Sequence, residues 1–256
     1  MGIKGKLKTG LYLSGQPIPI EAANLLVYQP TIKEITLFGE QDFSTGIALL
    51  THTNIFSEEI KKGNFDLEIY SDFQLLLIIM REDKNVKEII SKLLDFIFPT
   101  YDNIIINENS IDFYVKNEDK AIKVGVIHPF NFQFFQDTLS DLFEPEGEKE
   151  EEYNPANDAA AEIAEKLKRG RQRIKEQQSK KEGEQSIYAR YISVLSVGMN
   201  IDINMFFNYT PFQLYDTFKR YFLKQSADFY QKLQSTPFMD VSKMEVPKEW
   251  TSNIYE

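Results

Sequence analysis

The chain contains no cysteine, and this absence excludes several kinds of chemistry. Disulfide bonds, thiolate nucleophiles and thiolate metal ligands all require the missing side chain. Long apolar runs are missing too: the longest, Leu75–Met80, is far shorter than the roughly 20 helical residues that span a bilayer. The first residues lack the apolar stretch of a signal peptide. We therefore expect a protein of the reducing cytoplasm with no membrane anchor.

Histidine is scarce, and neither His52 nor His128 has a partner at the spacing of a metal site. His128 precedes a proline, which is typical of a turn. The motifs GxSxG, GxGxxG and HExxH, which mark hydrolases, dinucleotide sites and zinc proteases, are also absent. An enzyme would need a pocket that joins several of Asp112, Glu118, Asp119 and His128. We expect a protein that is not an enzyme and binds no cofactor and no metal.

The 256 residues carry 39 acidic and 29 basic side chains, for a formal net charge of −10. This charge opposes approach to nucleic acid phosphates. The one basic cluster, Lys166–Lys175, contains no aromatic residue that could stack on bases. Nucleic acid is therefore disfavoured as a partner, and the cluster is better interpreted as a counterweight to the acidic residues that precede it.

A charge-polarised segment separates two aromatic-rich parts of the chain. Residues 144–186 begin with the acidic run EPEGEKEEE and continue with helix formers that offer only a thin apolar stripe. The six glutamates between Glu144 and Glu152 require solvation. The pattern predicts an exposed, partly helical connector between two units, residues 1–143 and residues 187–256. Because an isolated helix of this kind is marginal, we also expect the second unit to move relative to the first.

The first unit has the pattern of an α+β domain. Short extended segments are predicted at Leu11–Leu13 and Asn24–Tyr28, between glycines and prolines. Short runs of β-branched and aromatic residues predict a hairpin at Asn103–Asn107 and Asp112–Val115, to which Ala121–Ile127 is expected to add a third strand. Apolar residues at three-and-four spacing predict helices at Thr31–Gly39, Phe43–His52, Val86–Phe98 and Phe130–Phe143. Ser71–Met80 is a buried helix or a strand, and its periodicity does not decide between them.

The second unit has the pattern of a small helical bundle. Ile187–Gly198 has an apolar face, and Gly198 suits a helix end. Asp202 can cap a short helix. A threonine, a proline and a glutamine in the segment Thr210–Gln213 form a capping box, which predicts the start of a long amphipathic helix.

The aromatic stripes at residues 130–135 and 206–222 are interpreted first as core. Their density leaves room for a surplus face, and Tyr, Phe and Arg are enriched at protein interfaces. A groove for a partner helix is the functional interpretation, and its candidate protein-binding residues are Phe212, Tyr215, Phe218, Arg220, Tyr221 and Phe222.

Three stretches resemble a family of proteins from the tail gene region of phages that infect Firmicutes. They are Pro30–Ile35, Tyr153–Asn157 leading into Ala164–Lys168, and Tyr209–Tyr215. The last of these, with the preceding SVLSVG and the closing Glu-Trp pair, looks like the helical end of tail assembly chaperones.

This resemblance implies a non-catalytic protein of the host cytoplasm. Such a chaperone coats the tape-measure protein and recruits tail-tube subunits before it leaves the particle. The chain departs from the usual small chaperone by its length and by its α+β first unit. A structural component of the tail or baseplate, located in the virion, is therefore the alternative.

Overall fold

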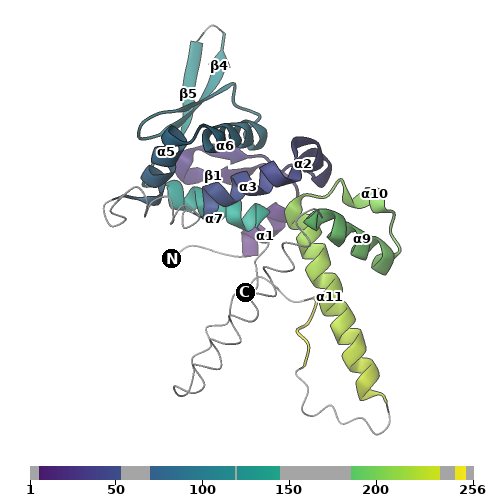
Figure 1. Ribbon diagram of the computed structural model, residues 1–256. Coiled ribbons are helices and arrows are strands. Elements are labelled where there is room, and N and C mark those ends of the chain that lie inside the picture. Colours follow the sequence, from purple (N-terminus) through teal and green to yellow (C-terminus); the bar gives the residue numbers. More distant parts are fainter. Residues whose placement is uncertain (1–5, 53–69, 119, 145–185, 237–245, 252–256) are drawn as a thin grey trace, which may run out of the picture.

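The predicted α+β architecture followed by a helical part is confirmed (Figure 1). A computed structural model describes residues 6–52, 70–118, 120–144, 186–236 and 246–251. Among the described residues, two small antiparallel sheets and several helices lie before residue 144, and three further helices lie between residues 187 and 234. Most of the predicted connector, residues 145–185, lies outside the described residues.

The first element, α1 (Lys6–Leu13), corrects the prediction that Leu11–Leu13 is extended. The tertiary contacts of Tyr12 explain the helix. Its side chain is buried, with its ring 5.2 Å from that of Phe212, and its hydroxyl donates a hydrogen bond of 3.1 Å to Asp141. Both partners lie far along the chain, so the local pattern could not reveal them.

The first sheet is a two-stranded antiparallel pair, β1 (Ile18–Ile20) and β2 (Leu25–Val27). The short helix η1 (Glu21–Ala23) joins the two strands. The second strand confirms the extended segment predicted there. The sequence analysis missed the first strand because prolines surround it, yet both of its isoleucines are buried.

Five helices supply most of the first core. They are α2 (Ile32–Phe38), α3 (Glu40–Thr51), α5 (Asp72–Glu82), α6 (Lys84–Ile97) and α7 (Phe132–Phe143). The ambiguous segment is therefore a helix, and a capping box of Ser71 and Gln74 begins it. In α2 the ring of Phe38 stacks on that of Phe96, whereas Leu37 is 80% exposed.

The second sheet confirms the predicted hairpin and third strand. Its order is β3 (Asn103–Ile106), β4 (Ile111–Asn117) and β5 (Lys120–Ile127), all antiparallel. The outer part of the β4–β5 hairpin projects from the body (Figure 1). Phe113 anchors the inner part, with its ring 4.9 Å from that of Phe98.

The C-terminal part consists of α9 (Ile187–Met199), α10 (Ile203–Phe206) and α11 (Pro211–Gln234). Asp202 caps α10, and Thr210 forms the predicted capping box at the start of α11. Gly198 lies near the end of its helix, as predicted, and the helix ends one residue later, at Met199. Asn200, which follows, adopts the left-handed conformation, and Gly198 lies against the ring of Tyr221.

The C-terminal helices share one core with the first part. The amides of Ile32 and Lys33 donate hydrogen bonds of 2.8 and 2.9 Å to the carbonyls of Tyr209 and Phe207. Leu214 is buried in the same continuous cluster of apolar side chains. These contacts disagree with the expected free motion between the two units, because such motion would break backbone hydrogen bonds and expose this core.

Candidate binding surface of the C-terminal helices

Helix α11 is longer than its contacts with the body require. Its 24 residues give a length of about 36 Å. The buried side chains of the helix all lie in its first quarter: Pro211, Phe212, Leu214 and Asp216. Beyond Leu223 every described side chain of α11 is exposed or half-buried, and the helix projects away from the body (Figure 1). The distal half therefore contributes little to the core.

Three of the predicted binding residues are used for packing instead. Phe212 is only 7% exposed and contacts Tyr12. The ring of Phe218 stacks on that of Tyr191, with centroids 4.1 Å apart. Tyr221 lies over the backbone of α9. These side chains hold α11 in place and offer little surface to a partner.

Two further predicted residues make polar and cation–π contacts. Arg220 forms an ion pair with Asp216, at 3.0 Å between Nε and Oδ2, and donates from Nη1 to the carbonyl of Trp250 at 2.8 Å. The ammonium of Lys219 lies 5.8 Å from the ring centre of Tyr215. Arg220 therefore fastens the segment around Trp250 to the middle of α11.

Phe222 is the predicted residue that does form an open apolar surface. It is 48% exposed, and Phe229, two helical turns further on, is 59% exposed. The sequence analysis missed Phe229, although the seven-residue spacing from Phe222 could have revealed it. Exposed apolar side chains on α9 and α10 include Val197, Met199, Ile203 and Met205. We call these six residues the C-terminal apolar surface.

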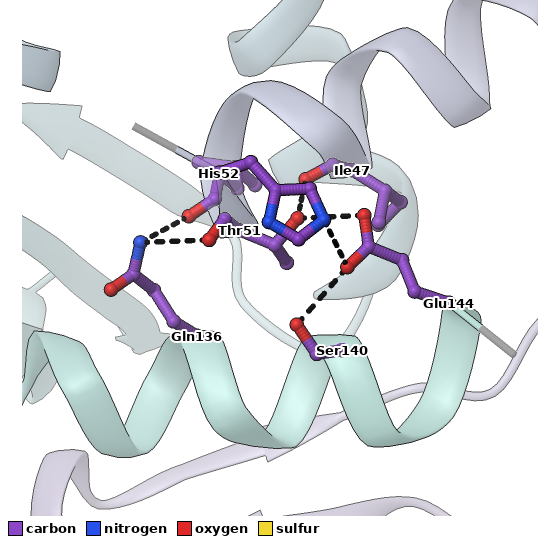
Figure 2. A network of polar contacts seen from close by, with 7 residues as sticks. Ile47, Thr51, His52, Gln136, Ser140 and Glu144 are labelled. Atoms are coloured by element: carbon purple, nitrogen blue, oxygen red, sulfur yellow. Dashed lines mark hydrogen bonds and ion pairs between the residues drawn. The ribbon is translucent and has the colours of Figure 1, made fainter. Parts of the chain in front are cut away.

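Polar side chains form a hydrogen-bonded network where the ends of α3 and α7 meet (Figure 2). Glu144 accepts hydrogen bonds from Thr51 at 2.8 Å and from Ser140 at 3.1 Å, and it lies 3.0 Å from Nε2 of His52. Gln136 donates to the carbonyl of Thr51 at 3.3 Å. The Ser140 hydroxyl is directed at a carboxylate and not at the imidazole, so the network lacks the nucleophile–base pair of a hydrolase. It ties two helix ends together.

The four residues considered for an enzyme pocket are not brought together. Glu118 lies in the turn between β4 and β5, whereas His128 follows the far end of β5. The eight residues of this strand separate the two positions by about 26 Å. Asp112 forms an ion pair of 2.8 Å with Lys123. Asp119 lies outside the described residues. His128 occupies a turn, as predicted, and its Nδ1 accepts a hydrogen bond from the next-but-one amide.

Among the described residues, no three side chains of His, Asp and Glu come close enough together to hold a metal ion. None of the helices there combines the length and the apolar character that crossing a bilayer requires.

Residues 181–255 match the family model described as the YomV second domain. The matched segment contains α9, α10 and α11 and associates the chain with a domain found in a phage protein. No curated protein and no solved structure matches the chain.

The whole C-terminal apolar surface falls inside the segment that matches the YomV second domain. The carbonyls of Phe207 and Tyr209, which accept the hydrogen bonds from the amides of α2, also lie within this segment. The segment thus combines a face that packs on the rest of the protein with a second face that stays open to solvent.

Proposed function

We propose that the protein is a non-catalytic phage tail assembly chaperone that binds the tape-measure protein and tail-tube subunits. The single observation that carries the proposal is the C-terminal apolar surface, in which Phe222 and Phe229 lie on a helix whose distal half projects from the core and the other four residues lie on α9 and α10. An amphipathic helix of a client can pack against such a surface. The match to a phage-protein domain and the resemblance of Tyr209–Tyr215 to chaperone sequences support the same assignment.

The chemistry of the surface suits a client that is itself rich in exposed apolar helix. Methionine and phenylalanine adapt to varied apolar partners, because one is flexible and the other is large and polarizable. The net charge of −10 would keep such a complex soluble. The same charge opposes nucleic acid and anionic membranes, so neither takes part in the proposal.

Co-expression with the tape-measure protein of the same genome tests this function. We expect a soluble complex that co-purifies. The paired substitution Phe222→Gln and Phe229→Gln should abolish co-purification, since it removes two exposed rings. Phe222 also packs against Phe218, at 4.7 Å between ring centroids, so circular dichroism should confirm that the variant stays folded. Leu37→Gln is the matched control, because Leu37 is 80% exposed on α2, and this variant should behave as the wild type. A tape-measure protein that stays insoluble with the wild type would refute the proposal.

The alternative function is a structural component of the tail or baseplate. The α+β first part favours it, because the two sheets and six α-helices described before residue 144 exceed what a small helical chaperone needs. Mass spectrometry of purified virions separates the two functions. A chaperone of the host cytoplasm should be absent from the particle, whereas abundant protein in the virion would establish the structural role.

A further inference from the structure

Two phenylalanines at the start of α7 are exposed, although the sequence pattern assigns them to the core. Phe130 is 91% exposed and Phe134 is 58% exposed. The other aromatic residues of the same stripe, Phe132 and Phe135, are buried as expected. Phe130 lies in the turn before α7 and Phe134 lies in the first turn of the helix, four residues further on, so the two exposed rings are close together along the chain. Exposed aromatic pairs of this kind are typical of protein-binding surfaces.

Hydrogen bonds from the buried side chain of Asn131 hold the turn that carries Phe130. Asn131 is only 3% exposed, and its Oδ1 accepts a hydrogen bond of 2.8 Å from the amide of His128. Its Nδ2 donates to the carbonyls of Val126 and Ala22 at 2.8 and 3.0 Å. This buried amide fixes the turn to β5 and to η1. Phe130 is thus presented in one position before any partner binds, which lowers the entropy cost of binding.

The charges beside the pair are acidic. Asp137 and Asp141 follow Phe134 at three and seven residues, so they continue the same face of α7, and both are exposed. Glu21, also exposed, adjoins Ala22, whose carbonyl accepts one of the Asn131 hydrogen bonds. The face is therefore apolar at the start of α7 and negative along the rest of the helix.

We propose that this face docks a basic amphipathic helix of a partner protein. The apolar side chains of that helix would cover Phe130 and Phe134, and its Lys or Arg side chains would pair with Asp137 and Asp141. The order of rings and carboxylates along α7 sets the orientation of the bound helix. This surface is separate from the C-terminal apolar surface, and the inference does not depend on the proposed function.

Peptide binding to the full chain tests the inference. The probe is a labelled Leu/Lys amphipathic peptide of about 18 residues, or five helical turns, and binding is followed by fluorescence anisotropy. The paired variant Phe130→Ser and Phe134→Gln should bind it at least about tenfold more weakly than the wild type, as expected for the loss of two aromatic anchors. Asp137→Asn should weaken binding about threefold at low salt, and this difference should vanish at about 500 mM salt.

Two controls make the result decisive. Leu37→Gln should bind the peptide as the wild type does, and a matched Leu/Glu peptide should not bind. Equal affinity of the wild type and the Phe130, Phe134 variant would overturn the inference, as would loss of binding in the Phe222, Phe229 variant alone. Sedimentation that shows a wild-type dimer, made monomeric by the Phe130, Phe134 pair, would instead identify a second copy as the occupant and overturn it too.

Discussion

At the scale of single residues, Gly198 permits the close packing of α9 on α11. A Cβ atom at this position would overlap the hydroxyl end of the Tyr221 side chain. Gly198→Ala should therefore lower the free energy of unfolding by about 1–3 kcal/mol through overpacking. Urea denaturation followed by circular dichroism measures this change.

Gly10→Ala is the control for the loss of a helical glycine. Nothing lies within 4 Å of the position where its Cβ atom would be, so this variant should be about 0.5–1 kcal/mol more stable than the wild type. Tyr221→Leu in the Gly198→Ala background should recover part of the loss. If Gly198→Ala alone were as stable as the wild type, the contact between the two helices would be looser than described.

A second residue-scale prediction concerns Tyr12 at alkaline pH. Burial, together with the negative charge of Asp141 and their hydrogen bond, raises the pKa of Tyr12 well above its usual value. A raised pKa means that the folded state favours the protonated phenol. Its contribution to stability is complete below the unfolded pKa of about 10 and falls as the pH rises above it. Tyr12→Phe should be less stable at pH about 8, by about 1 kcal/mol for the lost hydrogen bond, yet lose less stability between pH about 9 and about 11. Parallel alkaline unfolding curves for the two proteins would contradict this.

At the scale of the element, the two halves of α11 differ in how much they pack against the rest of the protein. The helix packs on α1, α7 and α9, and its buried side chains all lie within residues 211–216. The side chains of residues 224–226 are exposed, and those beyond are exposed or half-buried. An isolated helical segment of this length is marginal in water. Hydrogen-exchange mass spectrometry should therefore find amides of residues 225–234 exchanging about tenfold or more faster than those of residues 213–222. Uniform protection along the helix would mean that a partner, such as a second copy, already covers the distal half.

At the scale of the whole molecule, one core joins the parts on either side of residues 145–185. Proteolysis within that range should leave two fragments that elute together in size-exclusion chromatography. They should separate only in denaturant, because the Phe207 and Tyr209 carbonyls and the buried Leu214 hold them together. Fragments that elute apart under native conditions would restore the interpretation of two independent units.

The sequence by itself determined those features that depend on neighbours along the chain. Helical periodicity, the capping box of Thr210 and Gln213, and the cap at Asp202 were all predicted and are present, because each involves residues within four positions. The same locality made the start of α11 predictable and placed Phe222 on its apolar stripe, whereas the other five residues of the C-terminal apolar surface were not among the predicted binding residues.

Only the tertiary structure decided which side chains of those elements are covered. The helical state of Tyr12 depends on Asp141, which lies 129 positions away, and no local pattern carries that information. Phe218 and Phe222 share one amphipathic stripe, yet the first stacks on Tyr191 and the second stays open. An amphipathic pattern shows that burial of one helix face is favourable. That face is buried only where another element packs against it, and the fold as a whole determines where that element lies.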